Sequence, residues 1–281
     1  MSRINDWHIM AVLAIAGLAG PVLMPGLAMQ IAFLWLMVVF ALTWDMLGGR
    51  MGYNSFGNIV FFGIGCYAAA VVQRDAGLPY FEGLALGLVA GGVLAVLGAI
   101  VFGLAMLGLR GHYFAIGTLG LGIAAGEIAS GWEYVGAGSG LALPLFPGEL
   151  GQREIFFCTS LFAVAALCFL IFRWVYGTRF GLALNAIRDD HDMIGFIDPR
   201  DVAFAGATYG VWMVLMAILG GKGTLWGPVL GAFVFHITQE LFWTYLLGWQ
   251  RVALGFFIVV IAVFFPQGIM GWVEARRARQ G

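Results

Sequence analysis

The side chains of this sequence that commonly carry catalysis or bind metals are few and widely spaced. The histidines are His8, His112, His191 and His236, and the cysteines are Cys66, Cys158 and Cys168. No two histidines have a ligand spacing such as H-x-x-x-H, and the cysteines lie in apolar runs without a C-x-x-C spacing. No serine, histidine and acid arrangement and no phosphate-binding G-x-x-x-x-G-K-[ST] motif occurs. The sequence therefore predicts no metal, no cofactor and no enzymatic activity.

Two acidic residues, Glu127 and Asp45, lie within apolar stretches. An ionisable group inside a membrane costs roughly 2.5 kcal/mol or more, so it tends to face a cavity or a partner. Glu127 is therefore a candidate for a substrate pathway or a protein interface, the alternative being a satisfied group near a helix end. Asp45 is a weaker candidate, because it stands only two residues from Leu47 and can reach the membrane surface.

A glycine-broken stretch, Gly48–Asn58, carries amide and hydroxyl side chains between apolar segments. Irregular backbone at membrane depth is tolerated only against protein or water. A helix that starts near Ser55 would point its first N–H groups into such a cavity, where they suit an anionic group such as a substrate carboxylate. The alternative is a tightly packed turn without a ligand. The candidate pathway residues are Asn54, Ser55, Asn58 and Glu127.

The composition is that of a protein that crosses a membrane many times. Of the 281 residues, 62% are hydrophobic and only 10% are charged, whereas soluble domains carry about 25% charged residues. The formal net charge of −1 gives no reason to expect nucleic acid as a partner.

Apolar stretches divided by glycine, proline and charged residues predict an all-α fold, a polytopic transmembrane helical bundle in a single domain over residues 1–281. The first stretch has the look of a signal peptide but no small-residue cleavage pattern, so we expect a retained span. The expected spans cover about residues 8–25, 29–47, 55–72, 83–107, 113–130, 155–176, 204–219, 229–246 and 252–265.

The segment Gly177–Asp201, the hydrophilic island, differs from the rest of the chain. Of the 29 charged residues, eight lie between Arg179 and Asp201, so the island must lie in water. Its first half, Phe180–Ile187, keeps its apolar residues on one helical face and predicts a short amphipathic helix at a membrane surface. The residues alone leave two possibilities open, a docking element for a soluble partner and a solvated loop.

The distribution of arginine orients the chain, with the island, the C-terminal tail and the N-terminus in the cytoplasm. After the island only three apolar spans remain, and three crossings that start inside end outside. That would place the tail arginines Arg276, Arg277 and Arg279 on the external face. We therefore expect that a span of about 20 residues is missing between Ile194 and Gly195.

Several stretches together resemble the permease subunits of ATP-binding-cassette (ABC) importers for branched-chain amino acids, in particular the longer of the two permease types. The matching stretches, in the family's order, are LGGRMGYNSFGNIVFFGIGCYAA (47–69), LGLRGHYFAIGTLGLGIAAGEI (107–128), GAGSGL (136–141), YGTRFGLALNAIRDD (176–190), LGGKGTLWGPVLGA (219–232) and PQGIMG (266–271). Together they are spread over most of the chain, from residue 47 to residue 271. The family often has histidine where Asn58 stands, and the coupling motif here stops short after Asp190-His191-Asp192.

The resemblance implies a bacterial inner-membrane subunit that works with a second, similar permease, two cytoplasmic ATPases and an external substrate-binding protein. Residues 177–194 would hold a cytoplasmic coupling helix that docks on an ATPase, so that ATP-driven closure switches the pathway from outward to inward facing. The coupling residues carried over are Arg179, Gly181, Ala186, Arg188, Asp189 and Asp190. The implied cargo is leucine, isoleucine or valine, while close relatives carry urea, short amides or other amino acids.

An alternative of another class is a self-contained channel or a secondary transporter in which Glu127 couples transport to protons. This alternative predicts transport without an ATPase, and a strongly buried Glu127 that faces a continuous pore. An intramembrane enzyme is a third possibility, which the lack of paired catalytic groups argues against.

Overall fold

The structure is a computed structural model that describes residues 19–109, 111–137, 139–181 and 208–246, with isolated positions at 13, 17, 183–184, 249, 252–253, 255–256, 259–260 and 268–271. Every regular element within these residues is a helix, which confirms the all-α class. Among the described residues, four helical stretches are long and apolar enough to cross a membrane, at Pro25–Arg50, Tyr80–Met106, His112–Gly131 and Leu150–Tyr176.

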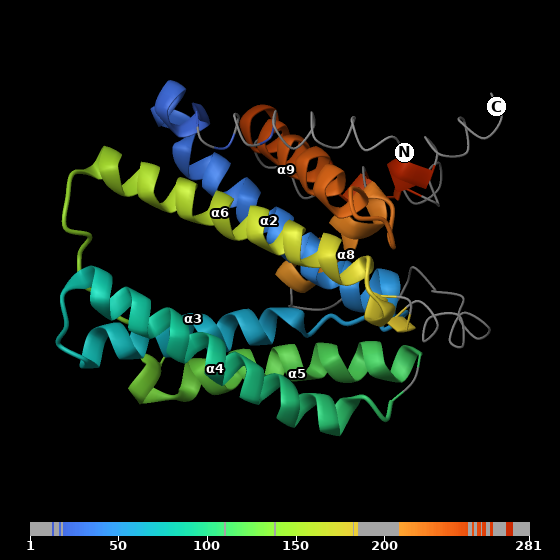
Figure 1. Cartoon of the computed structure of the whole chain (residues 1–281), viewed down its shortest axis with the longest axis horizontal. Coiled ribbons are helices and arrows are strands. Elements are labelled where there is room, and N and C mark those ends of the chain that lie inside the picture. The colour runs from blue at the N-terminus through green and yellow to red at the C-terminus, as the bar shows by residue number, and fades with distance from the viewer. Residues whose placement is uncertain are drawn as a thin grey trace. The chain divides into compact units, whose positions relative to one another are not determined.

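The chain divides into two compact units, whose helices are drawn in Figure 1. The first unit comprises Met1–Arg50, Gly148–Asn185 and Leu215–Gly281, and the second comprises Met51–Pro147 and Ala186–Val214. The helices are η1 (Pro25–Leu27), α2 (Ala28–Asp45), η2 (Met46–Arg50), α3 (Asn58–Asp75), α4 (Tyr80–Met106), α5 (His112–Gly131), η3 (Glu133–Val135), α6 (Leu150–Tyr176), α8 (Thr208–Gly220) and α9 (Gly227–Tyr245).

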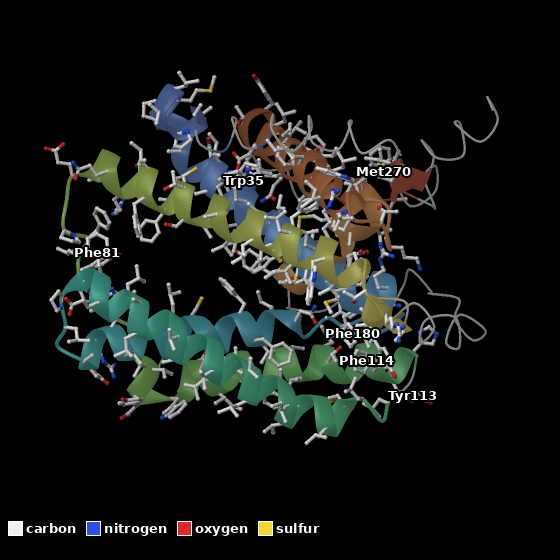
Figure 2. All side chains as sticks on the ribbon, in the orientation of Figure 1. Trp35, Phe81, Tyr113, Phe114, Phe180 and Met270 are labelled. Carbon is white, nitrogen blue, oxygen red and sulfur yellow. The ribbon has the colours of Figure 1, made fainter. Side chains whose placement is uncertain are left out.

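The first unit is built around α2, which packs against both α6 and α9. Trp35, labelled on α2 in Figure 2, meets Phe162 of α6 and Phe233 of α9 edge-on, with ring centroids 4.9 and 5.7 Å apart. Met37 and Trp44 of α2 have no exposed surface. A helix that is apolar on every side is suited to such a central position, and α2 carries no charge before its last residue.

Glycines hold the last part of α8, which belongs to the first unit from Leu215 onward, against α9 backbone to backbone. A Cβ atom on Gly220 would collide with the carbonyl of Gly227, and one on Gly231 would collide with the carbonyl of Met216. Pro228 occupies the first turn of α9, where its missing N–H costs nothing. The turn GGKGTLWGP at 220–228 therefore connects two helices that run antiparallel in close contact.

The second unit pairs α4 with α3 through small residues spaced by four. The only buried residues of α4 are Gly83, Gly87 and Gly91. A Cβ on Gly87 would lie 2.8 Å from the carbonyl oxygen of Ala69, and one on Gly91 would lie 2.6 Å from that of Gly65. Such small residues let helices approach where lipid supplies no hydrophobic drive between them. The other residues of α4 are exposed or half-buried within this unit.

Hydrogen bonds with Tyr134 connect an ion pair at the end of α3 to η3 in the second unit. Arg74 Nε lies 2.6 Å from Asp75 Oδ1, and the hydroxyl of Tyr134 donates to Asp75 Oδ2 at 2.8 Å. Arg74 also donates to the carbonyl of Tyr134 at 2.9 Å and lies over its ring. The hydrogen bonds from Arg74 and Tyr134 lower the pKa of Asp75 to about 2, because they favour the ionised carboxylate.

The observed helices differ from the expected spans mainly at their ends. Helix α3 begins at Asn58 rather than at residue 55, and α6 begins at Leu150 rather than at 155. Helix α6 begins earlier than expected because a helix can continue from the apolar core of the membrane into water. The change from apolar to polar residues therefore does not mark the end of the helix. Half of the expected first span, most of the last span and the Ile194–Gly195 junction lie outside the described residues.

Candidate functional site

The glycine-broken stretch leads into α3 through an irregular turn at residues 51–57. Ser55 is buried, with 3% of its surface exposed, and its Oγ accepts a hydrogen bond from the backbone N–H of Gly57 at 3.3 Å. Gly52 has φ +79°, a left-handed conformation that glycine adopts at low cost. The helix starts at Asn58 with Gly57 as its N-cap. Ser55 therefore holds the turn that precedes the helix, rather than beginning the helix itself.

Helix α5 supplies the partner of this turn. The backbone N–H of Phe56 donates to Thr118 Oγ1 at 3.2 Å, and that hydroxyl donates in turn to the carbonyl of Ala115 at 3.0 Å. A Cβ on Gly57 would lie 2.6 Å from the carbonyl oxygen of Thr118. The ring of Phe114, labelled in Figure 2, meets Tyr53 edge-on with centroids 4.9 Å apart. Two N–H groups of the turn thus already have hydroxyl acceptors within the chain.

Sequence reasoning missed Thr118, although one signal was available. It is a hydroxyl residue within an otherwise apolar span, and it lies 62 residues beyond its partner Phe56. A single threonine can equally bond its own helix, and Thr118 does so as well. The spacing alone therefore could not show that this hydroxyl also accepts from a distant turn.

The four candidate pathway residues do not come together as one cluster. Ser55 is buried at the turn, and Asn54 and Asn58 beside it are half-buried. Glu127 is exposed and stands nine residues beyond Thr118 on α5, about 14 Å along the helix at its usual rise. The turn therefore offers two side-chain amides near the start of α3, while Glu127 presents its carboxylate on the surface of the second unit.

The position of Asp45 in the structure was not predicted from the sequence. It is 1% exposed, and its Oδ1 accepts a hydrogen bond from the backbone N–H of Gly223 at 2.7 Å. Gly49, one turn later in the π-helical η2, lies directly against this carboxylate. Asp45 is therefore buried rather than at a surface, and it joins the end of α2 to the α8–α9 turn. A buried carboxylate needs such donors to offset its desolvation.

The end of α6 carries the described part of the hydrophilic island. The guanidinium of Arg50 lies 4.2 Å from the ring centroid of Tyr176, the last residue of α6. Thr178 Oγ1 then donates to the carbonyl of Val175 at 2.6 Å. A Cβ on Gly181 would lie 2.7 Å from the carbonyl oxygen of Val175, so the chain folds back closely on α6. Only glycine fits at position 181.

Two of the six predicted coupling residues can be placed. Arg179 is exposed and Gly181 is buried against α6, so the charged residue of this pair is presented outward. Ala186, Arg188, Asp189 and Asp190 lie outside the described residues. Among the described residues, no group of three or more histidines, cysteines or acidic residues is arranged to hold a metal ion.

Comparisons with known proteins agree on one family. Residues 26–198 match the family described as branched-chain amino acid transport system, permease component. The chain is 21% identical to the high-affinity branched-chain amino acid transport system permease protein LivM of Escherichia coli (strain K12), over 96% of this chain and 76% of that protein. It is 22% identical to LivM of Salmonella typhimurium (strain LT2), over 93% of this chain and 74% of that protein. No solved structure matches the chain.

Proposed function

Because the chain belongs to the family of branched-chain amino acid transport system permease components, we propose that it forms the translocation pathway of an ABC importer for leucine, isoleucine or valine. The observation that carries this proposal is the family match over residues 26–198, which includes the glycine-broken turn and most of the island. The chain is a transport permease of the bacterial inner membrane, and hydrolysis of ATP belongs to partner subunits.

The turn at the start of α3 is the proposed contact with the substrate. Ser55 and Thr118 fix its backbone, because their hydroxyls accept from the N–H groups of Gly57 and Phe56. Asn54 and Asn58 are half-buried there, so their amide groups can serve a zwitterionic amino acid, which needs both donors and acceptors. An aliphatic cargo side chain would lie against apolar surface beside these amides.

The end of α6 is the proposed coupling surface. Arg179 is exposed just after α6, and α6 is joined to the end of α2 through Tyr176 and Arg50. A push or pull by an ATPase on the island would therefore act directly on two spans of the first unit. Closure of the ATPases would move these spans and turn the pathway from outward to inward facing.

A second permease subunit is the proposed partner within the membrane. Helix α4 buries only its three glycines and α5 buries only Phe114 and Thr118. A Cβ added to Gly120 or Gly126 of α5 would meet nothing within 4 Å, so another helix can approach closely there. The proton-coupled alternative needs a buried Glu127, and this side chain is exposed.

Co-purification of the ATPases tests the proposed function. We expect the tagged chain, taken from membranes of the cell that produces it, to retain an ATPase pair and a second permease. Changing Arg188 and Asp189 together to alanine should lower ATPase retention by at least about tenfold, since truncating interfacial charges typically costs roughly 2 kcal/mol or more.

The matched control changes Arg153 and Glu154 to alanine, a pair of the same chemistry at the other end of α6. This control should retain the ATPases. Equal retention by both double variants, together with unchanged stimulation of ATP hydrolysis, would show that the island is an ordinary loop.

A further inference from the structure

Contacts in the first unit fix the direction of α6 relative to α2. Early in α2, Trp35 packs on Phe162, and at the end of η2 Arg50 lies over Tyr176. Residue numbers increase together along both helices. Helices α2 and α6 therefore run parallel, and both finish at the end of the unit that holds Asp45, Arg50 and Tyr176.

A second set of contacts fixes α9 in the opposite direction. Asp45 bonds Gly223 just before α9, and Trp35 then packs on Phe233. Further along, Gln30 donates to Glu240 at 3.4 Å. Residue numbers fall along α2 as they rise along α9, so the two helices are antiparallel.

Helix α8 takes its direction from α9. Gly220 lies against Gly227 and Met216 lies against Gly231, so α8 and α9 are antiparallel. It follows that α8 runs parallel to α2 and α6. The ends of α6 and α8 both lie at the Asp45 end of the unit, and α8 is the next described span after α6.

Two successive spans that run in the same direction need a return crossing between them. Only residues 177–207, 31 residues, lie between Tyr176 and Thr208. A helical crossing takes about 20 predominantly apolar residues. The longest uncharged run before Asp201 is Phe180–Ile187, eight residues long. This segment has no sequence that can form the crossing, and a charged, irregular chain is not tolerated against lipid.

The match to one relative indicates that this chain lacks length within the matched region. In the alignment with LivM of Escherichia coli, 96% of this chain, about 270 residues, is spread over 330 positions. About 60 aligned positions thus hold no residue of this chain, which is enough for one span with its connections. The match to the family also ends at residue 198, within the hydrophilic island.

We propose that the packing of the first unit needs one more membrane crossing than this chain supplies between α6 and α8. An apolar helix of about 20 residues, inserted between Ile194 and Gly195, lets the chain reach this packing in a membrane. Without it, the α8–α9 turn is inserted on the membrane face opposite to the end of α6. The proposal rests on helix directions and does not depend on the ATPase partner.

Cysteine labelling from each side of the membrane tests this proposal. Cys66, Cys158 and Cys168 are first changed to alanine, and single cysteines are introduced as Lys222→Cys in the α8–α9 turn and, at the two ends of α6, as Glu149→Cys and Arg179→Cys. All three positions are exposed. A membrane-impermeant maleimide is applied to right-side-out and inverted vesicles. We expect Lys222→Cys to be labelled on the face of Glu149→Cys in the unmodified chain, and on the face of Arg179→Cys after the insertion.

A disulfide between introduced cysteines provides a second measurement in the full chain. Asp45→Cys and Gly223→Cys stand where the side chain and the turn are in contact, so oxidation should join them only in the chain with the inserted helix. Labelling of Lys222→Cys on the Arg179 face in half or more of the unmodified molecules would overturn the proposal. Disulfide formation without the insertion would overturn it as well.

Discussion

Thr118 is the residue on which the proposed substrate turn most depends. Its hydroxyl accepts from the N–H of Phe56, and it is 5% exposed. Thr118→Val keeps the shape but leaves that N–H without its acceptor, at a cost of about 1–3 kcal/mol. We expect the amide of Phe56 to exchange its hydrogen at least about tenfold faster in Thr118→Val, at about 1.4 kcal/mol per tenfold. Thr118→Ser should leave this rate close to that of the parent, and equal rates in the two variants would contradict the assignment.

The lowered pKa of Asp75 predicts that its contact with Arg74 and Tyr134, outside the membrane, is sensitive to acid. Its pKa in the folded chain is about 2, below the value of about 3.9 for an unperturbed aspartate. The ionised form therefore stabilises the contact above about pH 4, and this stabilisation is lost as the pH falls toward 2. We expect the fluorescence of Trp132, which lies beside η3, to change between about pH 4 and pH 2.

Two variants identify the group responsible for this transition. Asp75→Asn should abolish the change, because its amide does not titrate. Glu149→Gln, at an exposed acidic position just before α6, should leave the transition in place. A transition that persists in Asp75→Asn would assign it to another carboxyl group.

The pairing of α3 with α4 gives a prediction at the scale of elements. Gly91→Ala would place a Cβ 2.6 Å from the carbonyl oxygen of Gly65, whereas Gly92→Ala would meet nothing within 4 Å. We expect Gly91→Ala to lower the free energy of unfolding by about 1–3 kcal/mol through overpacking. Gly92→Ala should be neutral or stabilising by up to about 1 kcal/mol, because alanine favours helix. Thermal unfolding in detergent measures the stability of both variants. If Gly92→Ala is less stable than Gly91→Ala, Gly91 does not lie on the face of α4 that packs against α3.

Element type was predictable from the sequence where apolar runs are long, and element partners were not. The helices α4, α5 and α6 follow from runs that reach or exceed the length of a membrane span. The start of α3 was expected near Ser55 but is Asn58, because the Phe56 N–H bonds to Thr118 of α5 and the Ser55 hydroxyl accepts from Gly57 within the turn. Asp45 could not be assigned because its donor, Gly223, lies 178 residues further along. Such long-range hydrogen bonds leave no local pattern.

At the scale of the whole molecule, the sequence resemblance identified the family that the comparisons confirm. The distribution of charge gave a second prediction. The positive-inside bias alone predicted that one membrane crossing is lacking after the island. The directions of α2, α6, α8 and α9 give an independent reason for the same conclusion.

The most direct test of the proposed function is contact between the island and an ATPase. A photoreactive residue placed at Arg179, exposed after α6, should form a covalent adduct with an ATPase subunit when the assembled complex is irradiated. The same residue placed at Glu149, exposed at the opposite end of α6, should form none. An ATPase adduct from Arg179 alone is the predicted result, and adducts from neither position or equally from both would contradict the account.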